Sequence, residues 1–276
     1  MNNRKSKWTK RKVVERIKEL HKELRRRPKR DDSPNLYQVS RKLFGNWNNA
    51  MEESGYNVKR NQKPRVPNKL TPELFYFTGL LITDGHLVED LKRRHYILLL
   101  FTSYEEEKDL ILNLIRKLFS YESYVRKRKT EVGSRINYEI HINSKELLYY
   151  FKNQIGLPTG QKSKSVRVPK IIFSVNRNNL VNFLRGVMDG DGNISLNKPL
   201  SISSGSIKFL KDLKGLFSRL NFKTSNIFWN GSCYCLPLFQ RDNNGINGCF
   251  YENANLFYPR KKQMLESNTF KNRNYY

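Results

Sequence analysis

The chain has 276 residues, which is enough for one large or two smaller domains with cores of their own. Its 52 Lys and Arg outnumber its 25 Asp and Glu, and the net charge of +27 predicts a polyanionic partner. A membrane surface is disfavoured because the basic residues are spread along the chain without a basic amphipathic anchor, and the longest apolar run, Tyr96 to Phe101, is too short to span a bilayer. With three cysteines and no Cys-x-x-Cys pair, a zinc site is not expected, and we expect an intracellular protein with reduced thiols.

The N-terminal part, residues 1–58, is predicted to be a separate three-helix module. Apolar residues at helical spacing indicate helices over 8–26 and 35–44, and a third begins after Asn46 and closes at Gly55. A basic run between Arg25 and Arg30 favours DNA contact over the alternative, a dimerisation or capping domain. Residues 59–69, with two prolines and no apolar period, are predicted to be an extended basic linker.

The next segment alternates helices with pairs of strands. Thr71 and Pro72 begin a helix that is predicted to run to Asp84. The pattern then predicts elements in this order: strands at 86–90 and 95–103, a helix at 104–119, strands at 124–129 and 135–143, and a helix at 145–156.

The two strands at 124–129 and 135–143 have one polar face each. In the second, Ile136, Tyr138, Ile140 and Ile142 alternate with hydrogen-bonding side chains. Arginine, asparagine and glutamate are residue types that contact base edges, although a solvated sheet face is the alternative for any one of them. The candidate DNA-binding residues are Arg126, Arg128, Arg135, Asn137, Glu139 and His141.

The second half repeats this order of elements. Its predicted elements are a helix at 177–191, strands near 193–203, a helix at 206–220, a hairpin at 224–240 that turns at Asn230-Gly231, and a helical stretch at 247–256. Residues 271–276 are expected to form a disordered tail.

One stretch occurs in both halves. Residues 77–87 read FTGLLITDGHL and residues 184–194 read LRGVMDGDGNI, with Gly79 matching Gly186, Asp84 matching Asp191, and Gly85 matching Gly192. The final glycine is expected to form a left-handed helix C-cap. Small residues four apart allow two helices to approach closely, so the two copies are predicted to pack together through Gly79 and Gly186.

This packing would bring Asp84 and Asp191 to the same end of the helix pair. A carboxylate at a helix C-terminus faces the negative end of the dipole, which costs about 0.3–1 kcal/mol. Two neighbouring carboxylates also repel each other, and a hard divalent cation such as Mg²⁺ would turn that repulsion into attraction. A lone Asp-Gly is usually only a turn, and the duplication is what favours a functional site.

The sequences TGLLITDG and RGVMDGDG resemble the signature of the LAGLIDADG homing endonucleases, with the eighth-position acid and the glycines kept in both copies. Ile82 stands at the sixth position of the first copy and Asp189 at that of the second, and Arg185 replaces a small residue. Residues 8–56 are also similar to a helical repeat found attached to homing endonucleases.

The resemblance implies an α+β fold with two pseudo-symmetric αββαββα halves, at 70–175 and 176–270, in one monomeric chain. It also implies a site-specific double-strand DNA endonuclease that recognises a long asymmetric site. Asp84 and Asp191, with the carbonyls of Thr83 and Gly190, would hold Mg²⁺.

A nearby lysine would assist catalysis. Lys162 and Lys261 occupy corresponding places in the two halves, and Lys198 and Lys208 are competing candidates. The alternative functions are an RNA-binding maturase that assists intron splicing and a non-catalytic DNA-binding regulator. The regulator is ranked last because both acids are present.

Overall fold

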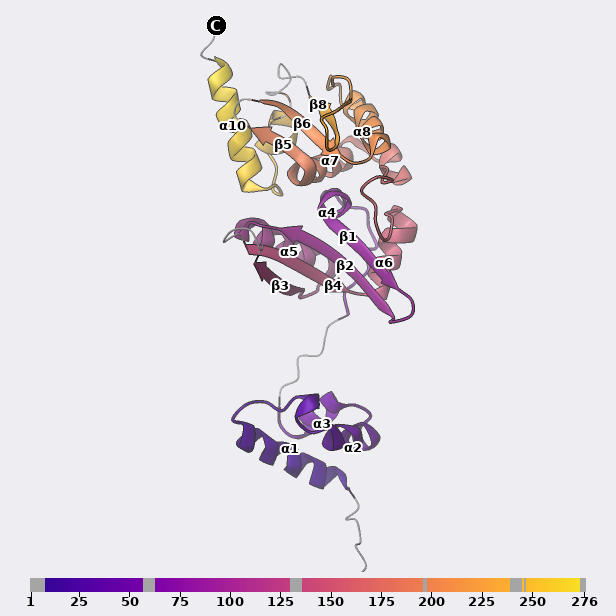
Figure 1. Ribbon diagram of the computed structural model, residues 1–276, viewed down its shortest axis with the longest axis vertical. Helices are drawn as coiled ribbons and strands as arrows, with labels where there is room; N and C mark the ends of the chain where they lie inside the picture. Colours follow the sequence, from indigo (N-terminus) through magenta and orange to yellow (C-terminus); the bar gives the residue numbers. More distant parts are fainter. Residues whose placement is uncertain are drawn as a thin grey trace, which may run out of the picture. The chain divides into compact units, whose positions relative to one another are not determined.

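The computed structural model describes residues 8–56, 63–129, 136–195, 198–238, 245 and 247–273 (Figure 1). The chain divides into two compact units, Met1–Asn61 and Gln62–Tyr276. Within the described ranges, no helix is both long and apolar enough to cross a membrane.

The smaller unit is a helical module with its own core. Its helices are α1 (Lys10–Leu24), α2 (Pro34–Phe44) and α3 (Trp47–Glu53), with a 3-10 turn η1 (Arg30–Asp32) before α2. Thr9 caps α1 and Asn46 caps α3, since their side chains accept backbone N–H bonds. The buried core residues are Val13, Ile17, Leu20, Leu36, Trp47, Ala50 and Met51.

The larger unit contains two four-stranded antiparallel sheets, with strand orders β1-β2-β4-β3 and β5-β6-β8-β7 (Figure 1). The first sheet comprises β1 (Gly85–Asp90), β2 (His95–Thr102), β3 (Tyr124–Lys129) and β4 (Ile136–Asn143). The second comprises β5 (Gly192–Ser195), β6 (Lys198–Ser204), β7 (Phe228–Trp229) and β8 (Tyr234–Pro237). The repeated strand order confirms the predicted duplicated α+β fold.

Helices cover the apolar face of each sheet. In the first half these are α5 (Glu105–Phe119), α6 (Lys145–Tyr149) and a π-helical segment η2 (Tyr150–Ile155) that continues α6. In the second half, α8 (Ile207–Arg219) packs against β6 and β8. The two halves share one continuous hydrophobic core.

The motif helices α4 (Pro72–Thr83) and α7 (Arg177–Asp191) join the two halves (Figure 1). A Cβ atom built on Gly79 would lie 2.8 Å from the backbone nitrogen of Val187, and one on Gly186 would lie 3.1 Å from the Cα of Gly79. Only glycine therefore permits this approach, and the predicted packing through the paired helices is confirmed.

Three local predictions are wrong. Gly85 and Gly192 begin strands instead of forming left-handed caps, and Gly192 has φ −70°. A side chain at Gly85 would lie 2.5 Å from the carbonyl oxygen of Leu81, so the glycine is needed for space. The helix α10 (Pro259–Arg273) includes the first residues of the expected disordered tail. The expected helix at 247–256 is only the short η5 (Gly248–Glu252).

Candidate functional site

Asp84 and Asp191 lie at the C-terminal ends of the two motif helices. Asp84 is the C-cap of α4 and its backbone carbonyl accepts a hydrogen bond from Phe101 in β2, while Asp191 is the last residue of α7. A Cβ atom on Gly190 would lie 3.1 Å from Oδ2 of Asp84, so the Asp84 carboxylate rests against the end of α7. The close packing of the two helices thus brings the acids to one end of the pair.

The electrostatics of the two acids show that they share one partly buried site. Burial, followed by the charge of Asp191, raises the pKa of Asp84 to about 7. Burial raises the pKa of Asp191 to about 6, against the opposing charges of Lys162 and Lys261. Burial therefore disfavours ionisation of both carboxylates, although two lysines lie beside them.

Lys162 and Lys261 both lie beside the acids. The Lys162 ammonium donates hydrogen bonds to the carbonyls of Leu81 (2.8 Å) and Ile82 (2.6 Å), and that of Lys261 donates to the carbonyl of Gly192. These are carbonyls at the ends of the motif helices, so the lysines offset the negative pole against which the acids are placed. Burial lowers the pKa of Lys162 to about 8 and also lowers the pKa of Lys261.

The competing lysines are placed differently. Lys208 is an exposed residue in the first turn of α8. Lys198 begins β6, and its side chain lies outside the described part of the structure. Among the described side chains, the geometry therefore brings Lys162 and Lys261 to the acids, and the catalytic role of the two remains a prediction.

A cleft of about 330 Å³ opens beside Asp84, between the two halves of the larger unit. Glu107 is buried here, where its carboxylate accepts hydrogen bonds from Thr102 (2.5 Å) and from Arg260 (3.2 Å). The Arg260 guanidinium also lies 4.2 Å from the centre of the Tyr104 ring. Glu107 does not stand out in the sequence, because it is one of three consecutive glutamates in the first turn of α5. Helices commonly carry acids at this position.

The sixth position of each motif is structural. Ile82 is buried, and Asp189 accepts hydrogen bonds from the hydroxyls of Tyr76 (2.7 Å) and Tyr251 (2.9 Å) and from the backbone nitrogen of Tyr258 (2.9 Å). Burial nevertheless raises the pKa of Asp189 to about 6. Asp189 therefore ties α7 to α4 and to the segment after η5.

The unusual Arg185 of the second motif is buried in the middle of α7. Its guanidinium donates to the carbonyl of Phe250 (2.9 Å) and to the side chain of Asn182, and it lies 5.5 Å from the centre of the Tyr76 ring. The helix packing accommodates this arginine because the two terminal nitrogens of its guanidinium have hydrogen-bond partners.

The predicted DNA-binding residues of β3 and β4 share one face of the first sheet. Arg126 and Arg128 are exposed, and they pair in register with Glu139 and Asn137. Glu139 is buried and forms ion pairs with Arg128 (3.0 Å) and with His141 when that ring is protonated (3.7 Å).

Asn137 connects this face to the acids. Its side chain accepts a hydrogen bond from Ser103 (2.6 Å), and both residues line the cleft beside Asp84. A polar surface thus runs from β3 to the end of α4. Arg135 lies outside the described residues, and the contacts of the other five with DNA remain predictions.

The donor set suits a hard cation. The described residues contain no group of three or more His, Cys, Asp and Glu that could hold a metal. The site instead combines two carboxylates with the last carbonyls of two helices, including those of Thr83 and Gly190, which lack intrahelical partners. Oxygen ligands of this kind fit Mg²⁺ or Ca²⁺, and the glycine at 190 lets the Thr83 side chain and the Asp84 carboxylate pack against the end of α7.

Comparison with protein families gives two matches. Residues 8–57 match the homing endonuclease associated repeat, and residues 178–228 match the LAGLIDADG-like domain. The second match covers α7 and the strands and helix that follow it.

Solved structures of low sequence identity share the fold. Mesophilic variants of the homing endonuclease I-DmoI are 19% identical with a TM-score of 0.54, over 71% of this chain and 98% of theirs. I-DmoI in complex with DNA and Ca is 20% identical with a TM-score of 0.53, over 71% and 98%. The homing endonuclease I-WcaI bound to its DNA recognition sequence is 15% identical with a TM-score of 0.54, over 72% and 88%.

Curated relatives share only a segment with this chain. The chain is 32% identical over 173 residues to the probable translation initiation factor IF-2 of Thermococcus kodakarensis, and 27% identical over 170 residues to a glutamine–fructose-6-phosphate aminotransferase of Methanocaldococcus jannaschii. Each match spans 61% of this chain, but only 13% of the first relative and 14% of the second. Their named activities therefore say nothing about this chain.

Proposed function

We propose that this chain, which carries the paired motif helices of the LAGLIDADG fold and a homing endonuclease associated repeat, is a site-specific double-strand DNA endonuclease. The observation that carries the proposal is the pairing of Asp84 and Asp191 at one end of the two packed helices, with Lys162 and Lys261 beside them. Structures with the same fold, described as bound to DNA and to Ca or Mn, support it.

Asp84 and Asp191, with the carbonyls of Thr83 and Gly190, would hold Mg²⁺ at this site. When bound, the metal activates water and stabilises the charge that develops on the phosphate and the leaving oxygen. The raised pKa of Asp84 fits this role, because a buried carboxylate beside a second acid is stabilised in its charged form by a bound cation.

The chain's own residues bind the DNA and move protons. The polar face of β3 and β4 would lie on the DNA backbone and base edges, which directs the scissile phosphates to the acids. Lys162 and Lys261 are held at their positions by main-chain carbonyls, so each ammonium is oriented before DNA binds. With a pKa of about 8, Lys162 can hold a proton next to a phosphate oxygen or accept one from water near neutral pH.

We also propose that the recognised site is asymmetric. The third residue of α5 is the buried Glu107, whose charge acts on Asp84, whereas the third residue of α8 is the buried Phe209, so the two halves differ at this position. One chain supplies both acids, which means that a monomer would suffice to cut both strands.

Cleavage of random DNA fragments with Mg²⁺, followed by sequencing of the new ends, tests the proposal. We expect paired ends to recur at one sequence that is not a palindrome, and we expect the double variant D84N/D191N to produce none. Ends that are randomly distributed, or that persist in the double variant, would contradict the proposal. Selective binding of structured RNA without any DNA cutting would favour the maturase alternative.

A further inference from the structure

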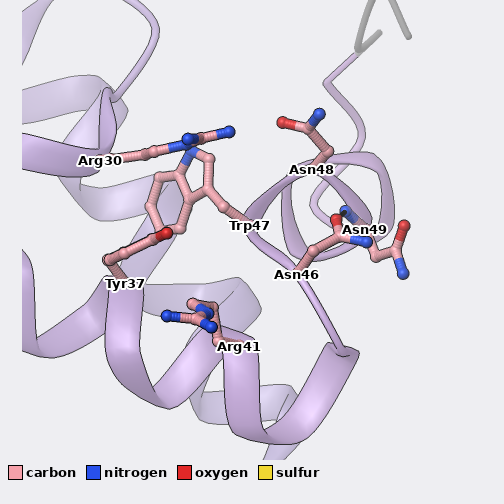
Figure 2. Close-up of a pocket in the computed structure, with 7 residues that line it drawn as sticks. All are labelled: Arg30, Tyr37, Arg41, Asn46, Trp47, Asn48 and Asn49. Carbon is pink, nitrogen blue, oxygen red and sulfur yellow. Dashed lines mark hydrogen bonds between the residues drawn. The ribbon is translucent and has the colours of Figure 1, made fainter. Parts of the chain in front are cut away.

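A pocket of about 300 Å³ lies on the helical module, well within the smaller unit and formed by residues of η1, α2 and α3 (Figure 2). We call it the Tyr37 pocket. Its lining residues are Arg30, Tyr37, Arg41, Asn46, Trp47, Asn48 and Asn49. The sequence pattern indicates no site in this region, and it does not indicate which helix of the module contacts DNA.

Part of the pocket is a rigid support. Trp47 is buried and meets the Tyr37 ring edge-on, with 6.2 Å between the ring centres. The Asn46 side chain accepts a hydrogen bond from the backbone of Asn49 (2.8 Å), and the Asn49 side chain donates to the carbonyl of Phe44 (2.8 Å). These contacts fix the wall of the pocket. They occupy the side-chain oxygen of Asn46 and the side-chain nitrogen of Asn49, two of the three asparagines in the lining.

The pocket also holds two arginines that face one aromatic ring. The guanidinium carbons of Arg30 and Arg41 each lie 5.8 Å from the centre of the Tyr37 ring (Figure 2). Both side chains are exposed, and neither has an ion pair within the described ranges.

Other arginines of the module differ in this respect. Arg11 pairs with Glu15 (2.9 Å), Arg16 with Glu23 (2.7 Å), and Arg26 with Asp32 (2.7 Å). Three arginines of the module are thus paired with carboxylates, whereas the two at this pocket have no carboxylate partner among the described residues. Like charges gathered at one pocket repel each other, and the phosphates of a polyanion bound at the pocket would offset that repulsion with attractions.

Asn48 adds a group for recognition. It lies beside Trp47 at the start of α3 (Figure 2), is half-buried, and has no hydrogen-bond partner among the described residues. A carboxamide next to an anion site can reach a base edge or a sugar, because it offers both a donor and an acceptor.

We propose that the Tyr37 pocket binds the backbone of double-stranded DNA, with Arg30 and Arg41 each holding a phosphate and with Asn48 directed to the adjoining groove. The proposal deepens the proposed endonuclease function, on which it rests, by naming the surface that the module presents to its partner. The flat guanidinium groups suit phosphate oxygens, and the Tyr37 ring keeps both in place without neutralising them.

The test measures binding of the full-length chain to a mixed-sequence DNA duplex in Ca²⁺ over a range of salt concentrations. Variants R30A and R41A should each weaken binding severalfold and should each reduce the slope of log affinity against log salt by about 1, because one phosphate contact is lost. R11A is the matched control, since Arg11 is exposed but already paired with Glu15, and it should leave the slope unchanged.

Each outcome decides the proposal. Because Arg30 and Arg41 are exposed, unchanged melting temperatures should accompany the loss of affinity. Slopes for R30A and R41A that match R11A would overturn the proposal, and so would an equal dependence on these arginines when duplex RNA replaces DNA. The readout does not depend on cutting, so a chain without nuclease activity could still confirm or refute the DNA-binding pocket.

Discussion

Asp84 and Asp191 each occupy a position that costs free energy in the absence of a ligand. They lie at the negative poles of two helices, partly buried and close enough to raise the pKa of Asp84. We therefore predict that D84N and D191N each reduce double-strand cutting by more than about 100-fold, since each removes a charge needed to hold Mg²⁺. Binding in Ca²⁺, measured by gel shift, should survive. Cutting at near the original rate by either variant would show that the metal site is elsewhere.

The same acids predict a pH dependence of stability in the metal-free protein. The pKa values of about 7 for Asp84 and about 6 for Asp191 lie above the value of about 4 expected in the unfolded chain. Between about pH 4 and pH 7 the native state holds protons that the unfolded state has lost, so the free energy of unfolding should fall as pH rises.

The asparagine variants check this dependence. At pH 7.5 without metal, D84N should raise the free energy of unfolding by about 2 kcal/mol, because it removes a buried carboxylate that is costly to ionise. The gain should vanish near pH 4, where Asp84 is protonated. Denaturant titrations at both pH values measure this gain. An equal gain at both would contradict the inference that ionising the buried Asp84 carboxylate destabilises the native state.

At the scale of elements, the α4–α7 interface depends on two glycines. A Cβ atom at Gly79 would lie 2.8 Å from the backbone of Val187, so we predict that G79A lowers the free energy of unfolding by about 3 kcal/mol or more. Gly215 is the matched control: it lies in α8, is exposed, and has nothing within 4 Å of a built Cβ. G215A should stabilise the protein by about 0.5–1 kcal/mol through helix propensity alone, and chemical denaturation compares the two.

The repeated motif made most of the fold predictable. Duplication of one stretch at matched positions predicted the helix pair, and the polar alternation over Ile136–Asn143 correctly predicted the apolar face of β4. Caps at Thr9, Asn46 and Thr71 were also predictable, because their side-chain bonds are local.

Long-range packing was not predictable from the sequence. In the sequence nothing distinguishes Glu107 from the two glutamates before it. Only the fold does, because Thr102 and Arg260 form hydrogen bonds with Glu107. Gly85 was predicted to form a left-handed cap, whereas the structure uses it to avoid the carbonyl of Leu81. The helix α10 has no marked apolar face, and it forms where Lys261 reaches the carbonyl of Gly192.

At the scale of the whole molecule, the charge of +27 predicts how affinity depends on salt. If the larger unit and the module together neutralise about eight phosphates, the slope of log affinity against log salt should be about −7. Binding measured by fluorescence anisotropy in Ca²⁺ between 50 and about 200 mM salt gives this slope. A slope shallower than about −2 would contradict an extended contact with DNA.

The module has its own buried core around Trp47, its own caps, and a boundary at Asn61. A chain that starts at residue 62 should therefore stay folded and should cut at the same position, because Asp84 and Asp191 fix that position. Its affinity should fall by about 10-fold or more, since a tethered second binding unit acts through effective concentration. The footprint on DNA should shorten on one side only, because the module is joined to the first half.

The competing interpretation is that the three helices only stabilise the larger unit. Truncation would then lower the melting temperature or the solubility and leave the footprint length unchanged. Hydroxyl-radical footprints of the two proteins on the same DNA, together with their melting curves, distinguish the two interpretations. A folded truncated protein with a full-length footprint would refute the DNA-binding role of the module. A shorter footprint that R30A and R41A reproduce in the full chain would assign the lost protection to the Tyr37 pocket.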